Sequence, residues 1–211
     1  MASMATKGEM VRALAQRFDL NPNKVDAMTR AMARAGLRTP GGRGRAAADM
    51  TGEDIFHLTL ALVMGLETKD APEVVRELSQ LRLVRGNLFL DGHIQWEANG
   101  DAGGESKLLD ALNRLPVAGL ELHRTFGAFG GQWLEEGFGD PEDGVSSAPV
   151  SVEVSSNGPH AVFSHRSDKG SLKLWFGDAA TDLKTPEWER RTILSDKLFR
   201  RLSNLAHDSA S

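Results

Sequence analysis

The sequence contains no cysteine among its 211 residues. Disulfide scaffolds, cysteine-based zinc ribbons, thiol catalysis and iron–sulfur clusters are therefore excluded. Long apolar runs are also missing, because the longest, residues 58–66, is interrupted by Thr59 and Gly65 and is far shorter than the roughly 20 residues that cross a membrane. The N-terminus has no apolar core of a secretory signal. We therefore expect a soluble, cytoplasmic protein that makes no membrane contact.

Recognisable catalytic patterns are scarce as well. The six histidines show no His-x-x-x-His spacing, which a helical metal site would require. The sequence has no Walker A motif, no Gly-x-Gly-x-x-Gly after a predicted strand and no Gly-x-Ser-x-Gly. Acidic residues within 135–143 are compatible with the magnesium site of a nuclease, but a solvated acidic loop is the simpler interpretation. We expect no enzymatic activity, no cofactor and no metal.

Charge is distributed unevenly along a chain whose composition, 40% hydrophobic and 26% charged, is that of a globular protein. Residues 1–50 carry nine basic and four acidic side chains, a net charge of +5, and the rest of the chain carries −9. An acidic protein with a basic N-terminal quarter can offer one patch to a polyanion while the remainder repels it.

The first 66 residues predict three helices around a basic loop. Apolar residues at helical spacing indicate a short helix over residues 7–18. A second helix begins after Asn21 as N-cap, with Pro22 in its first turn, and ends at Gly36. Residues 37–45 have no hydrophobic period and predict a loop. A third, mostly buried helix runs from Thr51 to about residue 65.

The remainder predicts a mixture of helices and antiparallel strands. Helices are expected over 72–83, 106–115 and 186–205, the last with Leu194, Leu198, Leu202 and Leu205 on one side. Two strands are expected around an Asp-Gly turn within 87–96. Three antiparallel strands with one wet face are expected near 150–154, 161–163 and 172–176. The four tryptophans are spread along the chain, so we interpret them as core anchors: Trp96, Trp133, Trp175 and Trp188.

The second helix carries the pattern that points most directly to function. Successive rotations of about 100° per residue place Asn23, Ala27, Arg30 and Arg34 in one narrow stripe, opposite Val25, Met28 and Met32. Arginine can pair with guanine, asparagine with adenine, and alanine permits close approach to a thymine methyl. Arginines in the following Gly-rich loop could enter a minor groove. The predicted DNA-binding residues are Asn23, Lys24, Ala27, Arg30, Arg34, Arg38, Arg43 and Arg45.

Residues 7–66 resemble a winged helix-turn-helix domain, with a turn at 19–21 and a second helix that runs through Arg34-Ala35-Gly36-Leu37-Arg38 into a basic wing. The order of two helices, wing and a further helix is most similar to the MerR and excisionase type. The resemblance covers about 60 of the 211 residues. It implies binding to duplex DNA, with the second helix in the major groove and the loop against the adjacent groove or backbone. The chain lacks the long dimerisation coiled coil and the metal-sensing cysteines of the MerR type, and its general composition resembles phage-derived proteins of high-GC bacteria.

We predict an α+β fold in which a helical winged helix-turn-helix domain precedes a small antiparallel-sheet α+β domain. The predicted organisation is a basic DNA-binding domain (residues 1–66), a connecting helix (67–85), an acidic α+β domain for oligomerisation or partner binding (86–206) and a frayed tail (207–211).

The predicted function is sequence-specific, non-enzymatic binding of double-stranded DNA by a homodimeric transcription regulator of phage or bacterial type. One alternative is a DNA-packaging factor similar to a phage small terminase, which would form a ring of many subunits. A second alternative is a protein-interaction module, whose basic head or acidic C-terminal region binds a protein partner.

Overall fold

The structure is a computed structural model that describes residues 7–39, 50–90, 93–99, 125–136, 150–155, 160–166, 170–177 and 191–207. These residues form six helices and a six-stranded antiparallel sheet, which confirms the predicted α+β class. The helices are α1 (Lys7–Phe18), α2 (Pro22–Arg34), α3 (Gly52–Val63), α4 (Ala71–Ser79), α6 (Phe126–Glu136) and α7 (Asp196–His207). The strands are β1 (Arg82–Leu90), β2 (His93–Asn99), β3 (Val150–Ser155), β4 (His160–Arg166), β5 (Gly170–Gly177) and β6 (Arg191–Ser195).

The first three helices end where local chemistry predicts. The side chain of Thr51 accepts a hydrogen bond from the backbone N–H of Asp54, whose carboxylate accepts one from Thr51 in return, so α3 begins with a complete capping box. Gly36 and Gly65 follow α2 and α3 with φ of +73° and +67°. A left-handed residue at this position lets the next N–H bond back to the last turn. The predicted bounds of these helices are therefore confirmed.

The sheet has one buried face and one open face. Its strand order is β2-β1-β5-β4-β3-β6, and every neighbouring pair is antiparallel. Alternate side chains of a strand point to opposite faces, and along β5 Leu172, Leu174 and Phe176 are buried whereas Lys173 is exposed. This alternation confirms the predicted strands with one wet face.

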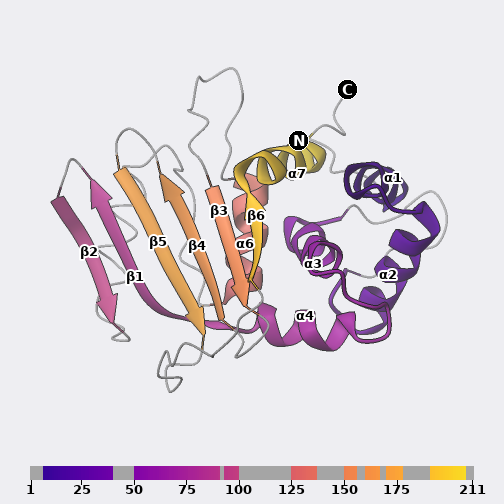
Figure 1. The fold of residues 1–211 in the computed structure, drawn as a ribbon, viewed down its shortest axis with the longest axis horizontal. Coiled ribbons are helices and arrows are strands. Elements are labelled where there is room, and N and C mark those ends of the chain that lie inside the picture. Colours follow the sequence, from indigo (N-terminus) through magenta and orange to yellow (C-terminus); the bar gives the residue numbers. More distant parts are fainter. Residues whose placement is uncertain are drawn as a thin grey trace.

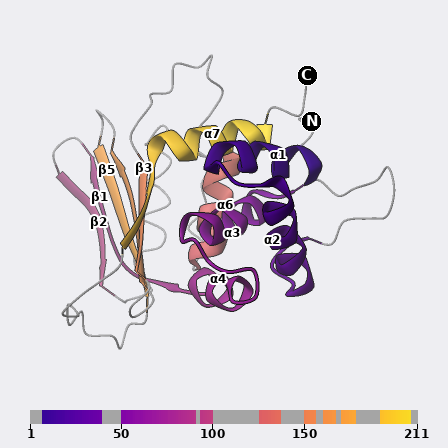
Figure 2. The same cartoon turned by 45° about the vertical axis from the view of Figure 1, so that its right-hand side comes forward.

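All of the labelled helices lie on the same side of the sheet (Figures 1 and 2). Helix α6 carries aromatic side chains to the buried face of the sheet, where Phe129 and Trp133 meet Phe163 with ring centroids 5.0 and 4.5 Å apart. Phe56 of α3 meets Phe126 of α6 at 5.1 Å. Helix α6 is thus the layer between the sheet and α3.

Glycines allow α3 and α6 to approach closely. A Cβ atom added at Gly131 would lie 2.6 Å from the backbone N of Glu53, and one at Gly130 would lie 2.4 Å from the Phe56 ring. The buried apolar side chains form one cluster that extends from Met10 in α1 to Leu202 in α7. The predicted division into domains 1–66 and 86–206 remains a prediction.

Two predicted helices are corrected by the structure. The connecting helix predicted over 67–85 ends at Ser79, and residues 82–85 already belong to β1. The final helix predicted from residue 186 is wrong for residues 191–195, which form β6 and pair with β3. Pairing with β3 buries Leu194 and satisfies the backbone of β6, and this outweighs the local helical pattern. The predicted helix 106–115 and residues 40–45 of the predicted wing lie outside the described residues.

The tryptophans do not all serve as core anchors. Trp133 is fully buried, as predicted. The prediction is wrong for Trp175, which is only half-buried. It lies on the open face of the sheet, in register with Arg85 on β1 and Val162 on β4. The side chains of Trp96 and Trp188 lie outside the described part of the chain.

Candidate nucleic-acid interface

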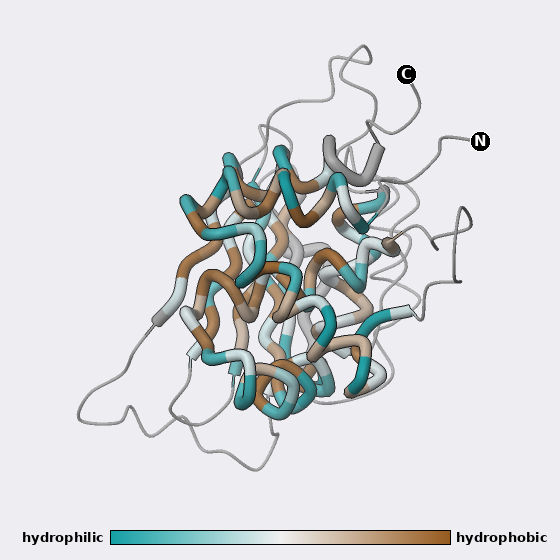
Figure 3. Tube along the Cα trace, turned by 90° about the vertical axis from the view of Figure 1, so that its right-hand side faces the viewer, coloured by the Kyte–Doolittle hydropathy of each residue, from teal (hydrophilic) through white to brown (hydrophobic). Residues whose placement is uncertain are grey.

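Helix α2 has one buried face and one exposed face. Val25, Met28, Thr29 and Met32 are buried against the other helices. On the opposite side Asn23, Arg30 and Arg34 are exposed and Ala27 is half-buried, and Lys24 is exposed at the edge of this face. From the side on which α1 and α2 lie, hydrophilic and hydrophobic segments alternate along the coils (Figure 3), as expected for helices with one covered face. The structure therefore brings five of the eight predicted site residues onto one accessible surface.

Helix α2 is capped at its N-terminus and tied to α4 at its C-terminus. The Asn21 side chain accepts a hydrogen bond of 2.8 Å from the N–H of Asn23, and Pro22 occupies the first turn, where no donor is needed. At the other end Leu37 donates to the carbonyl of Met32 at 3.0 Å, and Arg76 of α4 donates to the carbonyl of Ala35 at 2.7 Å. A helix fixed in this way presents its outer side chains at low conformational cost.

An acidic residue, Asp26, lies beside the exposed stripe and binds two cations. Its carboxylate is 2.6 Å from the Nζ of Lys7 and 2.9 Å from the guanidinium of Arg30. The hydrogen bond from Lys7 is the largest cause of a lowered pKa of Asp26, and the charges of Lys7 and Arg30 act in the same direction against partial burial. The pair orients Arg30, whose side chain nevertheless remains 57% exposed.

Lys7 and Asp26 are the two residues that sequence reasoning missed in this surface. The spacing of Asp26 and Arg30, four residues apart on one helix, could have indicated an ion pair. No sequence pattern places Lys7 there, because it reaches Asp26 only when α1 packs on α2.

The chain that leaves α2 is bound to α3, which changes the interpretation of Arg38. The N–H of Thr39 donates to the Asp54 carboxylate at 2.8 Å, and the Nδ1 of His57 lies 3.0 Å from the carbonyl oxygen of Leu37, in position to donate to it. Arg38 between them is half-buried, and its Nε is buried with no hydrogen bond within the described chain. The structure does not place Arg38 on the surface of α2, and Arg43 and Arg45 lie outside the described residues.

The helical head keeps the positive charge that the sequence indicates. Residues 7–39 contain seven basic side chains and three acidic ones, a net charge of +4, in a protein whose net charge is −4. Asp26 is paired with Lys7 and Arg30. The exposed side chains of Lys24 and Arg34 add further positive charge to the outer surface of α2. Such a surface attracts polyanions over a range set by the ionic strength.

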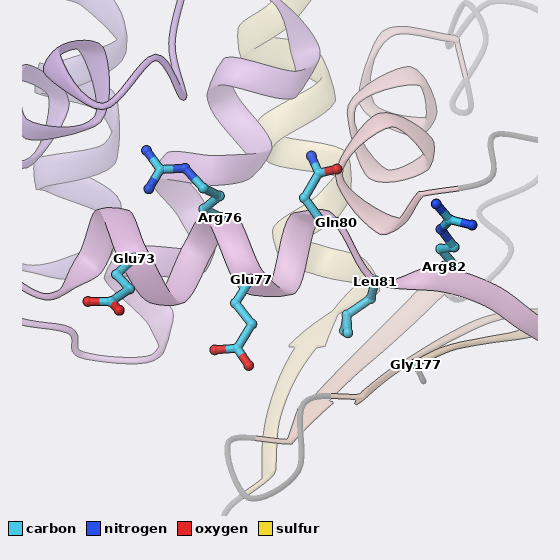
Figure 4. Close-up of a pocket in the computed structure, with 7 residues that line it drawn as sticks. All are labelled: Glu73, Arg76, Glu77, Gln80, Leu81, Arg82 and Gly177. Atoms are coloured by element: carbon cyan, nitrogen blue, oxygen red, sulfur yellow. The ribbon is translucent and has the colours of Figure 1, made fainter. Parts of the chain in front are cut away.

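An open depression of about 790 Å³ lies beside α4. Its lining mixes acids and bases: Glu73, Arg76, Glu77, Gln80, Leu81, Arg82 and Gly177. The stick view shows these side chains pointing in different directions instead of toward a common point (Figure 4). Since Arg76 is also occupied by the Ala35 carbonyl, the depression lacks the convergent groups of a catalytic site.

Within the described segments no group of three or more acidic or histidine side chains could hold a metal ion. None of the helices resolved in those segments is both long and apolar enough to cross a membrane. Comparisons with protein families, curated proteins and solved structures found no match for this chain.

Proposed function

We propose that this protein binds double-stranded DNA through the exposed face of α2. The main support is that four polar or basic side chains of α2 are exposed: Asn23, Lys24, Arg30 and Arg34. The other face of this helix is buried, its N-terminus is capped by Asn21, and its C-terminal end is bonded to Arg76. An α-helix fits the major groove of DNA, and these residue types have donors and acceptors that match base edges and phosphates.

In this proposal α1 and α2 form the helix-turn-helix, and the basic loop predicted over residues 37–45 serves as the wing. Arg30 and Arg34 read bases, and Asn23 near the N-terminus of the helix contributes an amide. Lys24 neutralises a phosphate. The physiological role that fits these contacts is transcription regulation of phage or bacterial type.

Asp26 has a defined part in this proposal. While DNA is absent, its carboxylate holds the guanidinium of Arg30 and the ammonium of Lys7. A phosphate or base acceptor then competes with Asp26 for Arg30, which lowers affinity for any DNA that does not supply a well-placed acceptor. A competing carboxylate of this kind favours specificity over raw affinity.

The test is a titration of labelled duplex DNA by fluorescence anisotropy. A library of random duplexes is first selected on the wild-type protein at about 150 mM salt, where weak attraction to polyanions is suppressed, and the enriched sequence becomes the probe. Replacing two groove contacts, Arg30→Ala with Arg34→Ala, is expected to weaken binding by about 2–6 kcal/mol. Equal binding by the wild type and this double variant would contradict the proposal.

The chain offers a matched control on α7. Lys197 and Arg201 are also exposed and four residues apart, so Lys197→Ala with Arg201→Ala removes the same charge at the same spacing. We expect this variant to bind the selected duplex nearly as well as the wild type. An equal loss in both double variants would show a diffuse charge effect without a reading helix.

The enriched sequence also tests the proposed dimer. A homodimer with two-fold symmetry reads two half-sites about one helical turn, roughly 34 Å, apart, so the selected motif should be palindromic and the light-scattering mass should be that of two chains. A ring of many subunits would support the packaging alternative instead.

A further inference from the structure

The open face of the sheet carries a regular array of nine outward side chains on β1, β5 and β4. Its rows across these strands are Arg85–Trp175–Val162, Asn87–Lys173–Ser164 and Phe89–Ser171–Arg166. None of the nine is buried. The array is therefore an accessible surface and not part of the core.

A β-bulge in β1 contributes to this surface. Leu83 pairs with Phe176 on the buried side, and the register then shifts so that Arg85 pairs with Trp175 on the open side. In a regular strand residues two apart share a face, so Leu83 and Arg85 would both point toward the core. The extra residue turns Arg85 outward, which is a known effect of bulges.

The cations of the array lie on its diagonal. Arg85, Lys173 and Arg166 are exposed, each on a different strand and in a different row. From the spacing of strands and residues, neighbours on the diagonal are separated by about 8 Å. None of the nine positions is acidic; two acidic residues flank the array in register, Glu97 on β2 opposite Asn87 and Glu153 on β3 opposite Val162. A chain of regularly spaced negative charges fits this diagonal.

Aromatic rings lie on either side of the cations. The guanidinium carbon of Arg85 is 5.1 Å from the centre of the Trp175 ring, and the Nζ of Lys173 is 4.9 Å from it. These cation–π contacts hold the indole in one orientation at the surface. Phe89, in the third row, is 38% exposed. Proteins that bind single strands combine cations with exposed aromatic rings on which bases stack. This surface has both.

We infer that the open face of β1, β5 and β4 binds single-stranded nucleic acid. The phosphates lie along Arg85, Lys173 and Arg166, and bases stack against Trp175 and Phe89. A duplex hides the faces of its bases within the stack, so two rings on a sheet gain contacts only from an unpaired strand. An acidic peptide would satisfy the cations but leave both rings without a planar partner.

This surface is separate from the α2 surface and does not depend on it. The open face of the sheet and α2 lie on opposite sides of the molecule, with α6 and α3 between them (Figure 2). The two proposals can therefore fail or succeed independently.

The test uses the full chain with labelled oligothymidylate and oligouridylate of about 12 nucleotides in an anisotropy titration. We expect the wild type to bind at least one of them, and the preferred strand identifies DNA or RNA as the partner. Trp175→Ala should weaken binding about tenfold, and Trp175→Phe, which keeps a ring, should recover most of the loss. Lys173→Gln with Arg166→Gln should weaken binding and reduce its salt dependence.

The controls separate this surface from general attraction and from α2. Lys197→Gln with Arg201→Gln, an equal charge change on α7, should alter binding less than twofold, and Arg30→Ala with Arg34→Ala should leave it unchanged. Circular dichroism verifies that each variant is folded. The inference is overturned if the wild type retains neither strand, if the Trp175 and Lys173 variants bind like the wild type, or if polyglutamate competes as well as the oligonucleotide.

Discussion

At the scale of single residues, Asp26 is the most informative position of the helical head. It is an acid in a basic segment, and it lies within ion-pair distance of Lys7 on α1 and Arg30 on α2. Pairs as exposed as these contribute little to stability in water. Their consequence is mainly geometric, because one carboxylate links Lys7 of α1 to α2 and orients Arg30, a predicted base-reading arginine.

The lowered pKa of Asp26 predicts a dependence of stability on pH. A carboxyl whose pKa is lower in the folded state stabilises the fold above its unfolded pKa, about 3.9, and loses that contribution as the pH falls through the folded value. At pH 7 we expect the free energy of unfolding of the wild type to be higher than that of Asp26→Asn, by less than about 1 kcal/mol. The difference should vanish toward pH 2, as measured by urea unfolding across this range. A difference that is independent of pH and of added salt would contradict the assignment.

At the scale of elements, α6 shows how one helix can serve two different neighbours. Phe126, Phe129 and Trp133 fill the space above the sheet, and Gly130 and Gly131 meet α3 without side chains. The Glu135 carboxylate accepts a hydrogen bond from the N–H of Gly52 at the start of α3, which adds a favourable charge at a helix N-terminus. Large residues on one side and glycines on the other determine the order of the layers.

Substitution of one of these glycines tests the close approach. Gly131→Ala places a methyl group 2.6 Å from the backbone of Glu53, so the helices must separate and the free energy of unfolding should fall by about 1–3 kcal/mol. Gly8→Ala in α1 is the control, since its Cβ meets only the end of the flexible Arg12 side chain, at 4.0 Å, and it should stabilise by up to about 1 kcal/mol. Urea unfolding measures both. Similar stability for the two variants would argue against a close α3–α6 contact.

At the scale of the whole molecule, α3 connects the helical head to the rest of the core. Ten of its twelve residues are buried, and it contacts α1 and α2 on one side and α6 on the other. A helix buried on every side requires partners around its whole circumference. The predicted domain boundary at residue 66 therefore follows directly after α3, the most central helix of the described chain. It separates α3 from α6, which covers it.

A fragment of residues 1–66 tests this dependence. Without α6 the fragment exposes Phe56 and other side chains of α3 that are buried in the full chain, at about 1.5–3 kcal/mol for each large apolar group. Because a domain is stable by only about 5–15 kcal/mol, we expect the fragment to be largely unfolded by circular dichroism and NMR. Cooperative unfolding of the fragment would instead support an independent N-terminal domain.

The sequence by itself determined the features that depend on neighbouring residues. The ends of α2 and α3 follow from Asn21, Thr51, Gly36 and Gly65, because capping hydrogen bonds and left-handed backbone are local. The strands β3 and β5 follow from alternation, and the exposed stripe on α2 follows from helical periodicity. These patterns need no information from the rest of the chain.

Only the tertiary structure decided the features that depend on contacts between distant segments. Lys7 reaches Asp26 through the packing of α1 on α2, and Arg38 is held near α3 by hydrogen bonds of its neighbours. Residues 191–195 are a strand because β3 offers them an edge, and Arg85 points outward because the bulge in β1 shifts its register against β5. In each case a contact across many residues outweighed a local preference, since local preferences amount to only about 1 kcal/mol per residue.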